Sequence, residues 1–292
     1  MSQVMVIGVV NGVMYGLLAL GVVMIYRGTR VLSFAQPELG TVTAFITWAL
    51  VTQHGWPWLA GAGVGIAVAV VASLLFERLV VRPMADAPRL SVTVATIGMM
   101  LLTLGVSAKV WGGSPRSLPP PISGLGRQVA GVFVSPTQLL SLVVAVLLGV
   151  GLTRFLRRSD FGLGVLAASE DTTAARLNGI PVDRVSAFTW GVAGALAGIA
   201  ALFIFPTLGA FTFGMMIKFF IFGLAAALVG GLTSLTGAFV GGLVVGVLTE
   251  SAKYAFLGSP VPGADTILVF VLIVGVLLLR PQGLLGRAGR TV

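Results

Sequence analysis

The feature that most constrains the fold is a series of apolar runs about as long as membrane-spanning helices. A helix crosses the hydrocarbon core of a bilayer, about 30 Å thick, with about 20 apolar residues. The sequence predicts nine such segments, of which the second and the last are short: Met5–Tyr26, Leu39–Val51, Pro57–Phe76, Ser91–Val110, Thr137–Leu156, Ala187–Phe205, Met216–Leu232, Gly237–Ala255 and Thr266–Leu279. The stretch Pro206–Met215 fits either an external loop or a re-entrant segment.

The composition excludes several classes of water-soluble protein. Hydrophobic residues make up 57% of the chain and charged residues 9%, whereas soluble domains carry about 25% charged residues. So few charges cannot cover the surface of a soluble globule of this size. A soluble enzyme, a nucleic-acid-binding domain and a disordered chain are therefore excluded. We expect an all-α, polytopic transmembrane bundle of about 8–10 spans, with residues 1–292 forming one transmembrane domain.

The chain offers little material for catalysis or metal binding. It has no cysteine, nine Asp and Glu residues and one histidine, His54, which lies beside Trp56 and Trp58 in a turn typical of an interfacial anchor. We therefore predict no catalytic residue and no metal site. Because Met1–Gln3 lacks a basic region, the first apolar run is interpreted as a retained span rather than a signal peptide.

Basic residues predict the orientation of the chain in the membrane, because Lys and Arg accumulate in cytoplasmic loops. An outer N-terminus places five basic residues outside, namely Lys109, Arg116, Arg127, Lys218 and Lys253. It places thirteen inside, namely Arg27, Arg30, Arg78, Arg82, Arg89, Arg154, Arg157, Arg158, Arg176, Arg184, Arg280, Arg287 and Arg290. We expect the C-terminus to be cytoplasmic, residues 111–136 to form an extracytoplasmic loop without regular helix, and residues 157–186 to form a cytoplasmic loop.

Few polar residues are predicted to lie at membrane depth. Glu38, at the inner edge of the second span, is either a helix-end charge, a partner for Arg27 or Arg30, or part of a gate. Asn11 is expected to form a hydrogen bond between helices, and Glu250 to pair with Lys253 three residues away.

No span carries the series of Asp, Glu and His residues that ion-coupled transporters need, so we expect the energy for transport to come from a partner. The chain lacks the phosphate-binding motif G-x-x-x-x-G-K-[ST] and is not itself the nucleotide-binding subunit.

Glycines cluster in the later spans. Gly194 and Gly198 form one pair at helical spacing, and Gly237, Gly241, Gly242 and Gly246 form a longer ridge. Small residues at this spacing let two helix backbones approach closely. Close packing is one interpretation of the ridges, and a polar path lined by backbone carbonyls in a bundle that rocks is the other.

The inner segment Arg157–Ser186 is predicted to contain a docking helix that lies parallel to the membrane. Good helix formers span Ala167–Leu177, with Ser169 as the expected N-cap and Glu170 and Asp171 in the first turn. Asn178 and Gly179 supply the stop signal, followed by Pro181.

This inner segment resembles the cytoplasmic loop of branched-chain amino acid permeases of ABC importers. Its pattern matches the coupling helix that seats in a groove of the ATPase, at Gly162, Ala167, Ala168, Glu170, Asp171, Ala174, Ala175, Gly179, Ile180, Asp183 and Arg184. Further blocks resemble the family in the same order, at Asn11–Gly12, Tyr15, Leu18–Gly21, Tyr26, Phe34–Glu38, Glu77–Arg78, Arg82–Pro83, Ala95–Gly98, Gly230–Gly231, Ser234, Gly237–Ala238, Gly241–Gly242 and Pro281–Gly286.

The resemblance implies a permease subunit in a bacterial plasma (inner) membrane. Its partners would be a second, homologous permease, two ABC ATPases that bind ATP and Mg, an extracytoplasmic solute-binding protein and membrane lipid, without nucleic acid. The chain itself would carry no cofactor. Its coupling residues would be those named above together with Arg176. The candidates for the translocation path are Asn11, Tyr15, Phe34, Gln36, Glu38, Thr96, Gly230 and Gly231.

Three other functions remain open at this point. The same kind of permease could carry urea, short amides or small organic acids instead of branched-chain amino acids. An ion-coupled secondary transporter or channel is a second alternative. An intramembrane enzyme is a third, although it would need paired catalytic groups or a metal cluster in the spans.

Overall fold

The computed structural model describes residues 2–122, 124, 126–129, 132–256, 263–279 and 283–285. Three residues of the predicted C-terminal motif, Pro281, Gln282 and Gly286, lie outside the described residues. The basic residues Arg280, Arg287 and Arg290, which contributed to the predicted orientation, also lie outside them.

The described residues form helices joined by short connections, with one small hairpin. The elements are α1 (Ser2–Thr29), α2 (Gln36–Trp48), the π-helical turn η1 (Ala49–Gln53), α3 (Trp58–Phe76), the π-helical turn η2 (Glu77–Val81), α4 (Arg89–Trp111), β1 (Arg127–Val129), β2 (Val132–Val134), α5 (Pro136–Arg158), α6 (Asp160–Glu170), α7 (Thr172–Leu177), α8 (Val182–Leu208), α9 (Met215–Gly230), α10 (Leu235–Ala255) and α11 (Ala264–Leu279).

Within the described residues, six helical segments are long and apolar enough to cross a bilayer: Gln3–Thr29, Trp58–Val81, Arg89–Trp111, Pro136–Arg158, Val182–Leu208 and Leu235–Ala255. They coincide with six of the predicted spans. The apolar helices Met215–Gly230 and Thr266–Val276 are shorter, and α2 runs directly into η1. The three remaining predicted spans are therefore also helical, and the prediction of a polytopic helical bundle is confirmed.

The chain divides into two compact units. Unit 1 contains residues Met1–Val23, Ile122–Gly151 and Phe220–Val292, and unit 2 contains Met24–Pro121 and Leu152–Phe219. The hairpin β1–β2, antiparallel with Gln128 opposite Phe133, belongs to unit 1. There the Gln3 side chain donates to the Phe133 carbonyl at 3.1 Å and accepts from the Phe133 N–H at 2.8 Å. The side-chain amide of Gln3 thus forms the two hydrogen bonds that a neighbouring strand would form with β2.

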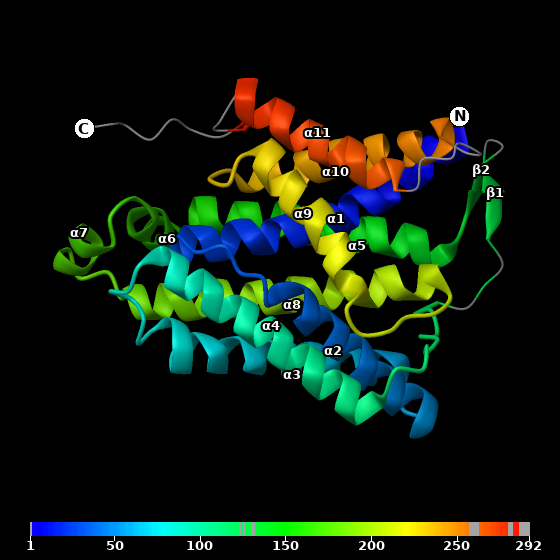
Figure 1. Ribbon diagram of the computed structural model, residues 1–292, viewed down its shortest axis with the longest axis horizontal. Helices are drawn as coiled ribbons and strands as arrows, with labels where there is room; N and C mark the ends of the chain where they lie inside the picture. The colour runs from blue at the N-terminus through cyan, green and yellow to red at the C-terminus, as the bar shows by residue number, and fades with distance from the viewer. Residues whose placement is uncertain are drawn as a thin grey trace. The chain divides into compact units, whose positions relative to one another are not determined.

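The core of unit 2 is built where α2, α3 and α8 pack on one another (Figure 1). Small residues bring the backbones together: a Cβ at Gly65 would lie 2.7 Å from the Thr43 carbonyl oxygen, and one at Gly194 would lie 2.9 Å from that of Ala69. The Ser73 hydroxyl donates to the Trp190 carbonyl at 2.7 Å. Close backbone approach and side-chain hydrogen bonds therefore hold these helices together, as expected where lipid removes the hydrophobic drive for association.

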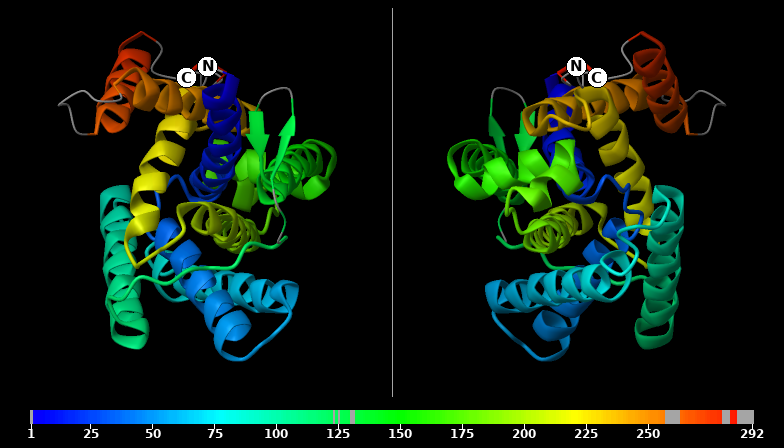
Figure 2. Two further views of the ribbon diagram at one scale, coloured as in Figure 1. Left: turned by 90° about the vertical axis from the view of Figure 1, so that its right-hand side faces the viewer. Right: turned by 90° about the vertical axis from the view of Figure 1, so that its left-hand side faces the viewer.

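The core of unit 1 is the contact between α1 and α10. A Cβ at Gly242 would lie 2.4 Å from the Gly16 nitrogen, and one at Gly246 would lie 2.3 Å from the Gly12 Cα. The predicted glycine ridge is thus a surface of backbone contact. On its other side α10 packs against α11, which runs beside it in both views of Figure 2.

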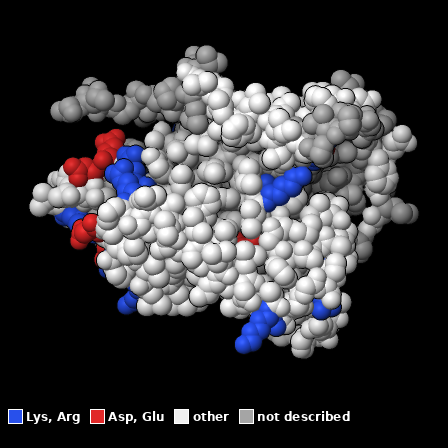
Figure 3. Space-filling model, viewed as in Figure 1, with Lys and Arg blue, Asp and Glu red and all other residues white. Residues whose placement is uncertain are grey.

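The faces of α3 and α4 are apolar and exposed. Leu59 on α3 is 80% exposed and Leu102 on α4 is 61% exposed. Figure 3 shows a largely white surface over these helices, whereas blue and red atoms gather at the end of unit 2 that carries α6 and α7. Exposed apolar helix faces are stable in contact with lipid acyl chains, so this exposure fits helices that cross a bilayer.

A bulky residue in the α1–α10 contact should destabilise the protein. We expect Gly246→Val to lower the free energy of unfolding by about 1–3 kcal/mol, because no side chain fits against the Gly12 backbone. The measurement is the melting temperature of the detergent-purified protein. Gly105→Val in α4 is the matched control, because a Cβ there meets nothing within 4 Å. Equal melting temperatures for the two variants would contradict the proposed role of this contact.

Candidate functional site

The segment between α5 and α8 folds into two short helices. The prediction of a single helix over Ala167–Leu177 with Ser169 as its N-cap is therefore wrong. Ser169 lies in the last turn of α6, where its hydroxyl donates to the Leu166 carbonyl at 2.6 Å. The break falls at Asp171, whose backbone is extended. An aspartate is among the best N-caps, so a new helix begins there in spite of the surrounding helix propensity.

The turn from α5 into α6 requires a glycine. The Ser159 hydroxyl accepts a hydrogen bond from the Gly162 N–H at 3.1 Å and caps α6. A Cβ at Gly162 would lie 1.9 Å from the Leu156 carbonyl oxygen. Only glycine therefore lets α6 fold back this closely on the end of α5.

The second helix, α7, is capped at both ends. The Asp171 carboxylate accepts from the Thr173 N–H at 2.8 Å and from the Ala174 N–H at 3.0 Å. At the other end Gly179 has a φ of 79°, a conformation that glycine adopts without strain. The predicted stop at Asn178 and Gly179 is confirmed by the end of α7 at Leu177.

The predicted coupling residues divide by exposure. Those exposed are Glu170, Asp171, Ala174, Arg176 and Gly179, while Gly162, Ala168 and Ala175 are buried and Ala167 is half-buried. Leu177, which the sequence pattern did not single out, is 85% exposed at the tip of α7. No local sequence signal indicates this exposure, because a leucine at the end of a helix is as often buried as exposed. The last residues of α6 and the whole of α7 form an exposed surface, here called the tip. This tip presents charges of both signs and one apolar side chain.

Beside this tip lies an apolar pocket of about 350 Å³. Phe161 and Ala167 of α6 line one side, and Ile180, Pro181 and Val185 line the side formed by the start of α8. An open, largely apolar pocket next to exposed charges has the composition of a protein-contact surface. The sequence did not predict this pocket, because it depends on how α6 packs against α8.

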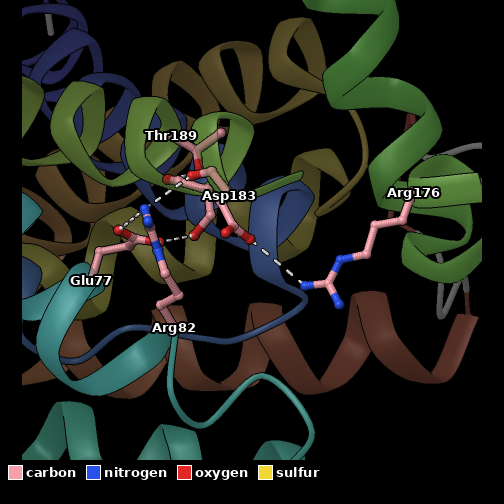
Figure 4. A network of polar contacts seen from close by, with 6 residues as sticks. Glu77, Arg82, Arg176, Asp183 and Thr189 are labelled. Atoms are coloured by element: carbon pink, nitrogen blue, oxygen red, sulfur yellow. Dashed lines mark hydrogen bonds and ion pairs between the residues drawn. The ribbon is translucent and has the colours of Figure 1, made fainter. Parts of the chain in front are cut away.

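A polar network fastens α7 and α8 to the end of α3 (Figure 4). Glu77, 1% exposed, pairs with Arg82 at 3.0 Å and accepts from the Ser186 hydroxyl at 2.8 Å. Arg82 also donates to the Asp183 carbonyl at 3.3 Å, and the Asp183 carboxylate pairs with Arg176 at 3.7 Å. The exposed Arg176–Asp183 pair contributes little energy. The buried Glu77 contacts are the structural centre of the network, because an unpaired buried carboxylate is costly.

A second link joins α6 to the connection between α1 and α2. The Arg30 guanidinium donates to the Ser169 carbonyl and lies over the Tyr26 ring, 5.6 Å from its centroid. Arg30 has a φ of 57°, unusual for a residue other than glycine. The cation lies near the carbonyl end of α6, where the helix dipole favours positive charge.

Four candidates for the translocation path lie in unit 2. Phe34 lies just before α2 and Gln36 and Glu38 lie in its first turn, and the Phe34 N–H donates to Thr96 Oγ1 on α4 at 3.1 Å. Gln36 is 1% exposed and Glu38 is 0% exposed. The structure thus brings these four residues to one region, but their contact with a solute remains a prediction.

The other four candidates lie in unit 1. Asn11 donates to Glu250 Oε1 on α10 at 2.9 Å, and Lys253 pairs with the same oxygen at 2.5 Å, so both predicted interactions are confirmed. Tyr15 is buried against Phe222, with the ring centroids 5.2 Å apart. Gly230 is the last residue of α9 and Gly231 begins the tight turn to α10, and a Cβ at Gly230 would lie 2.0 Å from the Gly237 carbonyl oxygen. The place of these four in a path stays a prediction.

Removing the arginine of the buried network should destabilise unit 2. We expect Arg82→Met to cost about 2–3 kcal/mol, because the Glu77 carboxylate would stay buried without its cationic partner. The melting temperature of the purified protein measures this cost, with Arg78→Met at a neighbouring exposed arginine as the control. The double variant Glu77→Gln, Arg82→Met should recover part of the stability. An equal effect of Arg82→Met and Arg78→Met would argue against the network.

Comparison with known proteins assigns the chain to a family. The family model described as branched-chain amino acid transport system / permease component matches residues 4–277. The permease protein BraD of a high-affinity branched-chain amino acid transport system, from Pseudomonas aeruginosa, is 31% identical, with 98% of this chain and 95% of that protein covered. LivH from Escherichia coli, of the same description, is 29% identical with the same coverage.

The fold is also found among solved structures. PsaBC from Streptococcus pneumoniae in complex with Fab matches with a TM-score of 0.50 and 11% identity, covering 96% of this chain and 92% of that one. This likeness concerns the fold alone. The family match over most of the chain, together with six helices able to span a membrane, shows a multi-pass inner-membrane protein that is a transport subunit. The chain therefore belongs to the permease components of branched-chain amino acid transport systems.

Proposed function

We propose that the chain is the membrane-spanning subunit of an ATP-driven ABC importer for branched-chain amino acids. The relatives named above are permeases of such amino acids by their descriptions. A homologous permease, two ATPases that bind ATP and Mg, and an extracytoplasmic binding protein would complete the complex. Energy would come from the ATPases, because the sequence carries neither a nucleotide-binding motif nor a series of ionisable residues within its spans.

The observation that carries this proposal is the construction of α6 and α7. Both helices are capped, their tip is exposed, and an apolar pocket lies beside it. We propose that an ATPase docks on this surface, through the exposed residues Glu170, Asp171, Ala174 and Arg176 and the projecting Leu177. Caps satisfy backbone groups at the helix ends and stabilise the helices, so a capped tip suits force transmission better than a solvated loop does.

The contacts within unit 2 suggest how movement of the tip reaches the spans. Arg176 on α7 pairs with Asp183 at the start of α8, and Asp183 is joined through Arg82 to Glu77 at the end of α3. Because only four residues separate α7 from α8, a displacement of α7 would move α8, and the buried contacts of Glu77 with Arg82 and Ser186 would carry that movement to the turn that follows α3. We propose that ATP binding and hydrolysis rock these helices and give alternating access. This assignment places α6 and α7 in the cytoplasm and the N-terminus outside.

The residues that line the translocation path are also part of the proposal. In unit 2 they are Phe34, Gln36, Glu38 and Thr96, and in unit 1 Asn11, Tyr15, Gly230 and Gly231. Their support is the position of each in or beside a spanning helix together with the family blocks that contain them. High-affinity selection would lie in the binding protein, so this path needs only modest affinity for the solute.

A bulky substitution at the tip should uncouple hydrolysis from transport. We expect Ala174→Trp to reduce ATP-dependent leucine uptake by at least about tenfold, since weakening the interface by about 1.4 kcal/mol changes binding tenfold. Ala174 is exposed, so the variant should insert and fold. The measurement is the ratio of leucine transported to ATP hydrolysed by the reconstituted complex.

The matched control for this experiment is Ala60→Trp, at an exposed alanine near the start of α3 on the expected outer side. It should leave the coupling ratio unchanged. Unchanged coupling in Ala174→Trp would remove the docking assignment. ATP-dependent uptake of urea or an organic acid in place of leucine would keep the importer but overturn its proposed substrate.

A further inference from the structure

Glu38 is a buried carboxylate that the fold does not satisfy. Its side chain is 0% exposed, and among the described residues neither carboxylate oxygen has a hydrogen-bond partner. The backbone of Gly214 and the side chain of Thr41 lie within reach of it, but the Thr41 hydroxyl donates to the Pro37 carbonyl instead, at 3.4 Å. Glu38 is thus a strong acceptor held in place without a donor in good geometry.

Two arginines of unit 2, Arg30 and Arg116, contact other groups. Arg30, on the same connection, donates to the Ser169 carbonyl. Arg116 lies over the Trp48 ring at 4.6 Å and donates to the Trp111 carbonyl at 3.3 Å. The ion pairs found in the described part of the chain join Arg82 to Glu77, Arg176 to Asp183 and Lys253 to Glu250. Glu38 is absent from all three.

The contrast with the other buried carboxylate of unit 2 is informative. Glu77, equally buried, has an arginine and a hydroxyl as donors, as is usual for a buried acid. Glu38 sits in the first turn of α2, where Ala35 provides no side-chain cap and Pro37 has no N–H. The positive end of the α2 dipole therefore offsets only part of the free-energy cost of burying the Glu38 carboxylate.

We propose that Glu38 is the counter-ion for the ammonium group of the transported amino acid, an inference that rests on the proposed function. An ammonium group carries the charge and the three N–H donors that the two unsatisfied oxygens lack. The surroundings offer apolar material for the remainder of an aliphatic amino acid, because Leu39, next to Glu38 on α2, is buried, as are Phe45 further along that helix and Phe211, whose ring centroid lies 4.9 Å from that of Phe45. Glu38 would hold the solute only while it passes, and the binding protein would retain the high-affinity selection.

The test compares Glu38→Gln with Glu38→Asp in the complete complex, reconstituted with its binding protein and ATP in liposomes. Glutamine keeps the shape of the side chain but loses the charge, whereas aspartate keeps the charge. We expect the initial rate of radiolabelled L-leucine uptake to fall at least about tenfold in Glu38→Gln, with part of the rate restored in Glu38→Asp. The melting temperatures of both complexes should stay close to that of the wild type.

A second measurement detects the ammonium contact directly. Leucine should raise the melting temperature of the wild-type complex without its binding protein, and the keto acid that corresponds to leucine, which lacks the ammonium group, should not. Glu38→Gln should abolish this difference. A purely structural role for Glu38 would change the melting temperature without changing the difference between the two solutes.

The control is Asp86→Asn, which removes an exposed carboxylate of unit 2 that belongs neither to the proposed path nor to the docking surface. It should leave the preference for leucine over the keto acid intact. Equal uptake by Glu38→Gln and wild type, or an unchanged leucine preference, would overturn the proposal. Failure of the proposed function looks different, because the wild-type complex itself would then show no ATP-dependent leucine uptake.

Discussion

Close approach of helix backbones is the constraint on which this structure depends. Lipid surrounds the spans, so burial of apolar side chains gives little drive for helix association, and van der Waals contact has to replace it. In unit 1 the backbones of α1 and α10 touch through Gly12, Gly16, Gly242 and Gly246. In unit 2, Gly65 and Gly194 do the same for α3 against α2 and α8. Any side chain at these positions would separate the helices and remove this packing.

The distribution of charge follows from the same environment. Charges at membrane depth are expensive, so each has a specific partner or a specific use. Glu250 is bonded to Asn11 and Lys253, and Glu77 to Arg82 and Ser186. The exposed charges of α6 and α7 lie where a partner subunit can reach them. Glu38 departs from this pattern, and for that reason we assign it to the solute rather than to the fold.

Much of the fold could be predicted from the sequence, because apolar runs of fixed length report directly on the bilayer. Six of the nine predicted spans are confirmed as helices long enough to cross a bilayer in the described part of the chain. The Glu250–Lys253 pair and the hydrogen bond of Asn11 are also confirmed, because the first depends on spacing along one helix and the second on a polar residue in an apolar stretch. The glycine ridge of α10 was also visible in the sequence. Its partner, α1, was not, since small residues indicate a close approach without indicating to what.

Tertiary contacts account for what sequence reasoning missed. Ser186 bonds Glu77 across 109 residues, and no local pattern indicates such a pairing. The break between α6 and α7 shows the opposite case, in which a local signal was present but helix propensity obscured it. Helix formers on both sides of Asp171 suggested one continuous helix, yet its carboxylate bonds two N–H groups and starts a second one. Capping therefore outweighed propensity at this residue.

We propose that this chain provides a gated path for the solute and has no energy source of its own. The most direct measurement is leucine accumulation in liposomes that contain either the purified chain alone or the chain with its permease, ATPase and binding-protein partners. The account predicts accumulation only in the complete complex supplied with ATP, whatever sodium or proton gradient is imposed. Accumulation of leucine by the chain alone, driven by either gradient, would contradict it.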